Sequence, residues 1–162
     1  MAVKVILSIG SNMGERTGNC RLAIDALTAM GGVILLKESS FYETIPWGKT
    51  NQPDFINCAV LVESTLAPLN LLEKLKEIEF NIGRNHGERW GPRLIDLDLV
   101  IYGDVVMESE ILTLPHRYAH ERAFVMIPAA EVAPEMIHPL FRKSVREIAD
   151  GFADKGEVRR VE

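Results

Sequence analysis

The chain has few cysteines and no long apolar run, and each shortage excludes a class of protein. Its two cysteines, Cys20 and Cys58, are too few for a disulfide framework and too widely separated for a metal-ligand motif, so we expect reduced, mostly buried thiols. No stretch approaches the roughly 18 consecutive apolar residues of a membrane span. The apolar N-terminus is about one strand long and lacks the features of a signal peptide. We therefore expect a cytoplasmic protein.

Positive charge is also in short supply. Eighteen Lys and Arg residues are set against 23 Asp and Glu residues, which gives a formal net charge of -5. Proteins that bind along a nucleic acid carry clustered, excess Lys and Arg on their surface. The chain is therefore not expected to bind nucleic acid, and any polyphosphate ligand should be small and held by a local basic cluster.

The chain is long enough to bury a core of its own. It has 162 residues, of which 47% are apolar, and neither an internal repeat nor a shift in composition divides it. We expect a single domain over residues 1–162, and a monomer.

Hydrophobic patterning predicts strands that are separated by helices. β-Branched and apolar runs predict strands at residues 3–9, 33–39, 55–62 and 94–102. Helical spacing predicts one helix that contains residues 22–30 and a second that runs from Pro68 to Gly83. A third helix is predicted to begin at the capping box of Ser144 and Glu147 and to end near Gly151. The order of these elements favours an α+β fold of ferredoxin-like type, with a mixed or antiparallel sheet and helices packed on it.

Two aspartates alternate with apolar residues in the last predicted strand. Because side chains alternate between the faces of a strand, Asp96 and Asp98 should point the same way. The opposite, apolar row should be buried and indicates a central strand; it comprises Ile95, Leu97, Leu99 and Ile101. Neighbouring carboxylates repel each other, and magnesium is a natural compensating cation. The alternative is an exposed face on which both aspartates are merely hydrated.

A basic, glycine-rich segment precedes this strand. Residues 83–93, GRNHGERWGPR, contain Arg84, Arg89 and Arg93 but only one acid, Glu88. Guanidinium groups match phosphate oxygens, and the glycines would let the segment close over a ligand. Metal and cationic groups around one polyphosphate are what phosphoryl transfer needs. The turn at residues 10–12 lacks the spacing and the lysine of a phosphate-binding loop and is interpreted as structural.

The segment RWGPRLIDLDLVIYG, residues 89–103, resembles the signature of the 6-hydroxymethyl-7,8-dihydropterin pyrophosphokinases, a family of folate-synthesising enzymes. The resemblance extends over nearly the whole chain, through IGSNMG, SSFYETIPWG, QPDFINCAV, LTLP and HERAFVMIPAAEVAPE. It implies a three-layer α-β-α fold of ferredoxin-like type. It also implies two magnesium ions, MgATP as pyrophosphate donor and the pterin alcohol as acceptor, with AMP and the pterin diphosphate as products.

The resemblance implies roles for individual residues on the donor side. Asp96 and Asp98 are the expected ligands of both magnesium ions, and Arg84 and Arg93 are expected to act on the phosphates, so these four are the expected catalytic residues. Further residues expected to bind ATP are Lys76, Glu79, Arg89, Trp90, Thr113, His116 and Arg122. A simple solvated i,i+3 ion pair is the alternative interpretation of Lys76 and Glu79.

On the acceptor side, the resemblance implies that Phe55 and Phe124 enclose the pterin ring while Asn57 and Thr44 meet its polar edge. Phe55 and Asn57 are two residues apart on one strand and can therefore face the same pocket. Pro46 and Trp47 are expected to shape the loop beside the ring. Without the family, either phenylalanine would be interpreted as ordinary core.

Three departures from the family pattern leave questions open. Only four residues separate Arg84 from Arg89, so His86 is a candidate substitute for basic residues found there in the family. The order Arg117 then Tyr118 leaves open which of the two contacts ATP. Ile111 stands where a basic residue can occur.

Two other functions fit the residues without the resemblance. One is a different Asp-x-Asp, magnesium-dependent transferase, acting on a nucleotide or a sugar. The other is a non-catalytic ferredoxin-like module that binds a small ligand or RNA, since that fold supports many functions. The negative charge argues against RNA.

Overall fold

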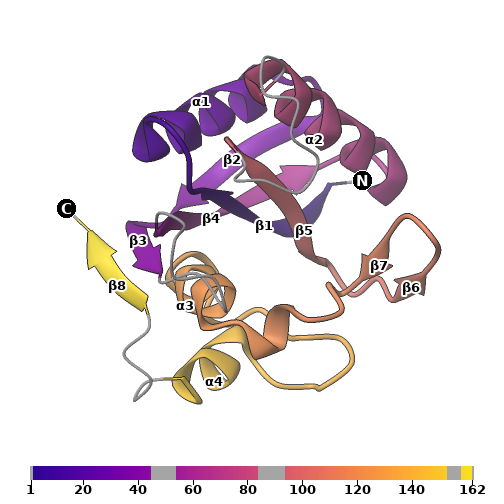
Figure 1. Cartoon of the computed structure of the whole chain (residues 1–162). Helices are drawn as coiled ribbons and strands as arrows, with labels where there is room; N and C mark the ends of the chain where they lie inside the picture. The colour runs from indigo at the N-terminus through magenta and orange to yellow at the C-terminus, as the bar shows by residue number, and fades with distance from the viewer. Residues whose placement is uncertain (1, 45–53, 84–93, 153–157, 162) are drawn as a thin grey trace.

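The computed structural model describes residues 2–44, 54–83, 94–152 and 158–161. A six-stranded sheet forms the middle layer, with helices on both of its faces (Figure 1). Its main path runs β5 (Asp96–Tyr102), β1 (Val3–Ser11), β4 (Phe55–Ser64), β3 (Phe41–Thr44) and β8 (Val158–Val161). The sixth strand, β2 (Val33–Glu38), pairs with the second half of β4. All strand pairings among the described residues are antiparallel.

Within the described ranges, four α-helices cover the sheet, two on each face. Helices α1 (Arg16–Ala29) and α2 (Pro68–Gly83) pack on one face and α3 (Ala123–Val132) and α4 (Val145–Asp150) lie on the other (Figure 1). A short 3-10 helix, η1 (Ala119–Glu121), precedes α3, and β6 (Met107–Glu108) pairs with β7 (Thr113–Leu114). The arrangement is the expected three-layer α+β fold.

The side chains of β1 contribute alternately to the apolar cores on the two faces of the sheet. Val5, Leu7 and Ile9 are fully buried beneath α1 and α2, whereas Ile6 is fully buried beneath α3. Side chains on one strand point alternately to its two faces, so a single apolar strand stabilises both layers of helices. This explains why seven of the nine positions of β1 are buried.

A β-bulge interrupts the pairing of β1 with β5. Leu7 pairs with Leu99 and Ile6 pairs with Ile101, which leaves Val100 as the extra residue. The bulge moves Ile101 into the core beneath α3. The prediction that Ile101 shares a face with Leu99 was therefore wrong.

Strand β5 ends the strand order, so the prediction of a central strand was also wrong. Ile95, Leu97 and Leu99 are nevertheless buried, because they belong to the core that includes α1 and α2. The side chains on one face of a strand can be buried even when no further strand pairs with its outer edge. A helix covering the sheet is sufficient.

The two helices with the strongest local signals were predicted correctly. Helix α2 begins at Pro68 and ends at Gly83. At α4, Ser144 Oγ accepts the Glu147 N–H at 3.1 Å, and Glu147 Oε1 accepts the Ser144 N–H at 3.1 Å, which is the predicted capping box.

Other predictions need adjustment. Helix α1 buries Cys20, Ala23, Ile24 and Leu27, whereas Leu22, the first residue of the predicted helical range, is 56% exposed. The sequence patterns did not predict α3, β3 or β8. Both cysteines are free and fully buried, as expected. Among the helices of the described ranges, none is long and apolar enough to cross a membrane.

Candidate active site

Asp96 and Asp98 lie at the start of β5. Asp96 pairs with Gly10 of β1 and Asp98 pairs with Ser8, while Leu97 between them is buried beneath α1 and α2. Alternation therefore places both carboxylates on the sheet face that carries α3. Both residues are partly exposed. Two acidic groups thus share one accessible end of this face.

Helix α2 holds the backbone between the two aspartates. The Leu97 N–H donates to Glu79 Oε2 at 2.7 Å, and Lys76 Nζ lies 3.3 Å from Glu79 Oε1. Because β5 is the last strand of the order, Glu79 accepts from an amide at the edge of the sheet. The i,i+3 ion pair of the alternative interpretation exists, but Glu79 also positions the strand on which the aspartates lie.

A cavity of about 390 Å³ opens between α2, β5 and the segment 111–122. The residues that line it are Leu72, Lys76, Leu97, Asp98, Leu99, Ile111, Leu112, Thr113, His116, Arg117, Tyr118 and Arg122. Four of the residues expected at the nucleotide therefore line the same cavity as one of the two aspartates. Its apolar and cationic lining suits a ligand with a flat apolar part and an anionic part.

His116 is held in one orientation. Its backbone N–H donates to the Val100 carbonyl at 2.8 Å, and its side-chain Nδ1 accepts the Tyr118 backbone N–H at 3.2 Å. Burial lowers the pKa of His116, Asp98 opposes that shift, and Arg122 reinforces it. The side chain is therefore neutral at neutral pH and directs Nε2–H as a donor.

Arg122 connects the cavity to α3. Its Cζ atom lies 5.8 Å from the Tyr118 ring centroid and 5.9 Å from that of Phe124, and both are cation–π distances. Arg117 and Tyr118 both line the cavity, although Arg117 also forms a 2.9 Å ion pair with Glu108. Arg122 thus lies beside Phe124, which is expected at the pterin, and beside Tyr118, whose contact with ATP was left open.

Asn57 and Thr44 form a buried polar pair on the face that carries the aspartates. Asn57 Nδ2 donates to Thr44 Oγ1 at 3.2 Å. Asn57 pairs with Gly10, which in turn pairs with Asp96, so these three residues form a row across three strands. Phe55 lies two positions from Asn57 on β4 and is partly exposed, as is Phe124 on α3.

Gly10 belongs to this site. The sequence analysis interpreted residues 10–12 as a structural turn and did not place Gly10 in the site. A Cβ atom at Gly10 would lie 2.6 Å from Asn57 Oδ1. Only glycine leaves room for the amide. A glycine inside a strand is a sign of such a close approach, and this signal was available in the sequence.

The comparisons with known proteins decide the family. Residues 6–134 match the family model described as 7,8-dihydro-6-hydroxymethylpterin-pyrophosphokinase. A 2-amino-4-hydroxy-6-hydroxymethyldihydropteridine pyrophosphokinase of Methylorubrum extorquens is 40% identical over 159 residues, covering 98% of this chain and 99% of that protein. The protein of the same name from Haemophilus influenzae is 35% identical, covering 97% and 98%. The chain belongs to the 7,8-dihydro-6-hydroxymethylpterin-pyrophosphokinase family.

This family assignment makes the chain an enzyme, a pyrophosphokinase of folate biosynthesis. Solved structures agree on the fold. The chain superimposes on Plasmodium falciparum HPPK-DHPS, the wild type with pteroate, with a TM-score of 0.78 at 14% identity. The superposition includes 99% of this chain and 48% of the Plasmodium falciparum chain, so this chain spans about half of that solved structure.

Several expected site residues of the pyrophosphokinase lie outside the described residues. They are Arg84, Arg89, Trp90, Arg93, Pro46 and Trp47, together with the candidate substitute His86. Across the described part of the chain, no group of three or more His, Cys, Asp or Glu side chains could hold a metal ion. The pair Asp96 and Asp98 nevertheless fits magnesium, which takes one or two protein carboxylates and completes its shell with phosphate and water.

Proposed function

We propose that this pyrophosphokinase transfers pyrophosphate from MgATP to 6-hydroxymethyl-7,8-dihydropterin at Asp96 and Asp98. One observation carries the proposal: the two carboxylates lie on one sheet face, in line with the Asn57–Thr44 pair and beside the 390 Å³ cavity. In a reaction between two bound substrates, the catalytic groups must lie between the two binding regions, and the aspartates have that position.

The cavity is the proposed ATP site. Its apolar residues Leu72 and Leu112 would contact the base, while Lys76 and Arg122 supply positive charge for the phosphates. Thr113 and neutral His116 supply hydroxyl and imidazole donors. Arg84, Arg89, Trp90 and Arg93 stay predicted contributors to the same site.

The pterin would lie along the Gly10–Asn57 row. An amide both donates and accepts, so Asn57 can match the mixed donors and acceptors of a pterin edge, with Thr44 holding its orientation. Phe55 and Phe124 are the proposed faces for the ring, because a flat heteroaromatic group stacks on aromatic side chains. Pro46 and Trp47 stay predicted neighbours.

Asp96 and Asp98 would hold the two magnesium ions of the family, whose chemistry is to neutralise charge on the polyphosphate. The acceptor hydroxyl would attack the β-phosphorus, its proton passing to Asp96, and the bond from the β-phosphorus to the α–β bridging oxygen would break. AMP leaves with that oxygen, and two phosphoryl units stay on the pterin. Arg84 and Arg93 are the candidates to hold the transferred β–γ unit in line.

Product analysis tests this assignment. Purified enzyme is incubated with MgATP and 6-hydroxymethyl-7,8-dihydropterin, the nucleotides are separated, and the pterin product is weighed by mass spectrometry. We expect equal amounts of AMP and pterin diphosphate. ADP with a pterin monophosphate would contradict transfer from the β-phosphorus, and no consumption of ATP would favour a module that only binds its ligands.

The proposal also includes a cytoplasmic monomer whose partners are small molecules alone. Sedimentation velocity of the purified chain should give a single species near the 18.1 kDa of one chain. A stable dimer would contradict the monomer, and recovery of the native enzyme in a non-cytoplasmic fraction would contradict the location.

A further inference from the structure

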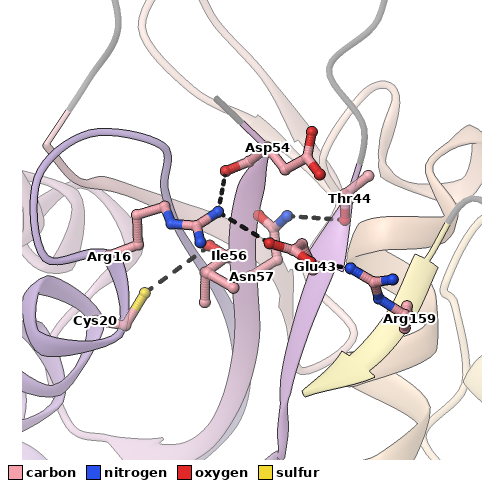
Figure 2. A network of polar contacts seen from close by, with 8 residues as sticks. All are labelled: Arg16, Cys20, Glu43, Thr44, Asp54, Ile56, Asn57 and Arg159. Carbon is pink, nitrogen blue, oxygen red and sulfur yellow. Dashed lines mark hydrogen bonds and ion pairs between the residues drawn. The ribbon is translucent and has the colours of Figure 1, made fainter. Parts of the chain in front are cut away.

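A three-residue ion network lies behind the pterin side of the site, at the end of β3. Glu43 Oε2 is 3.2 Å from Arg16 Nη1, and Glu43 Oε1 is bound by Arg159 Nη2 (Figure 2). Each carboxylate oxygen thus has its own arginine. The arginines come from α1 and from the C-terminal strand β8.

Arg16 contacts one residue shortly before the segment 45–53 and one directly after it. Besides Glu43 on β3, its Nη1 donates to the Asp54 carbonyl at 2.6 Å, immediately before β4 (Figure 2). Thr44 and Phe55, which adjoin these contacts, are paired with each other across the two strands. The guanidinium group therefore fixes the spacing at which the chain leaves β3 and enters β4.

The same contacts bear on the Asn57–Thr44 pair from the opposite face of the sheet. Glu43 pairs with Ile56, and these two residues directly precede Thr44 and Asn57 in their strands. The Ile56 carbonyl also accepts a long hydrogen bond from Cys20 Sγ of α1, at 3.9 Å. A shift of β3 along β4 would change the 3.2 Å distance from Asn57 Nδ2 to Thr44 Oγ1.

The network differs from an ordinary surface ion pair. The Glu43 side chain is only 19% exposed, and the hydrogen bond from Arg159, with help from Arg16, lowers the pKa of Glu43 despite its partial burial. A carboxylate shared by two arginines loses less side-chain entropy per contact than two separate pairs. The pair Arg21–Glu38 also joins α1 to a strand, at 2.8 Å, but both its side chains are well exposed.

We propose that Glu43, held by Arg16 and Arg159, is a positioning residue for the pterin half of the site. It sets the register of β3 against β4 and so the geometry of Thr44 and Asn57. This inference rests on the proposed function, because it takes that pair as the group that meets the pterin. Arg16 should matter more than Arg159, since it also binds the Asp54 carbonyl.

Steady-state kinetics test the effect on the reaction. Glu43→Gln keeps the shape of the side chain but removes its charge, and Arg16→Ala removes both contacts of the guanidinium group. Each should raise the KM for the pterin about five- to tenfold while kcat and the KM for ATP change less than about twofold. Arg159→Ala should have a smaller effect, and Arg159→Lys should recover part of it. Arg21→Ala, the matched control, should leave all three parameters unchanged.

A second measurement does not depend on turnover. The two side-chain N–H signals of Asn57, once assigned by NMR, should shift in Glu43→Gln and Arg16→Ala but not in Arg21→Ala. Unchanged Asn57 signals would overturn the positioning role, as would equal increases in the KM values for pterin and ATP. If the wild type makes no pterin diphosphate, the proposed function fails, and the NMR comparison still decides whether Glu43 positions Asn57.

Discussion

The two faces of the sheet differ in chemistry although the same strands build both. The face beneath α1 and α2 is mainly apolar, apart from the ion network of Glu43 at its β3 end; its buried strand residues include Val5, Leu7, Ile9, Val60, Leu97 and Leu99. The face beneath α3 is apolar at one end and polar at the other, where Ser8, Gly10, Asn57, Asp96 and Asp98 lie. Alternation lets one strand stabilise the fold with one row of side chains and serve the reaction with the next.

Removing the acidic pair should separate the two faces most sharply. Asp96→Ala or Asp98→Ala should reduce kcat by about 10³-fold or more, because a metal ligand contributes several kcal/mol of charge stabilisation. The melting temperature should be unchanged or higher, because carboxylate repulsion is relieved. Turnover and calorimetry check both halves of the prediction. Asp25→Ala is the control, because Asp25 is an exposed aspartate on α1. Near-normal turnover in Asp96→Ala or Asp98→Ala would contradict the assignment of these residues as metal ligands.

The opposite result is expected on the apolar face. Leu7 is fully buried and points away from the aspartates, so Leu7→Ala should lower the free energy of unfolding by about 2–5 kcal/mol. The kcat of the folded enzyme, measured well below its melting temperature, should stay within about threefold of the wild type. Urea unfolding measures the change in the free energy of unfolding, and steady-state kinetics measure kcat. A large loss of kcat at full folding would show that the two faces are not independent.

A smaller effect is expected where the polar face depends on glycine. Gly10→Ala places a Cβ atom 2.6 Å from Asn57 Oδ1, and displacing that amide should cost about 1–3 kcal/mol. The KM for the pterin should rise about tenfold, with the KM for ATP unchanged. Gly31→Ala is the matched control, because no atom lies within 4 Å of its added Cβ. Equal KM values in the two variants would contradict the close approach.

The smallest effect concerns the loop between α3 and α4. His138 Nδ1 accepts the Leu140 and Phe141 N–H groups at 3.3 and 3.2 Å, and burial lowers the pKa of His138 below its ordinary 6.5. Between the folded and unfolded pKa values the unfolded chain binds more protons, so the free energy of unfolding should fall as the pH falls below about 6.5. His138→Asn supplies an acceptor at every pH and should reduce this dependence in melting curves from pH 5 to 8. An unchanged slope would exclude His138 as its source.

Local signals predicted the elements that depend on neighbouring residues. Proline in a first turn and glycine at the end delimited α2, and the reciprocal bonds of Ser144 and Glu147 capped α4. Helix α3 is apolar at every position except Glu131 and contains an internal proline, Pro128, so the spacing pattern did not reveal it. Strand β8 has only four residues, two of them arginines, and becomes a strand because β3 offers it an edge.

The sequence alone predicts that Asp96 and Asp98 share a face, because alternation along an extended backbone is a local geometric property. What the two carboxylates face depends on tertiary packing. The bulge at Val100 and the contact of Gly10 with Asn57 depend on how separate strands pair. The ion pair of Glu43 with Arg159 joins residues 116 positions apart. Such contacts form where packing brings distant segments together, and no pattern within a window of one helix or strand specifies that meeting.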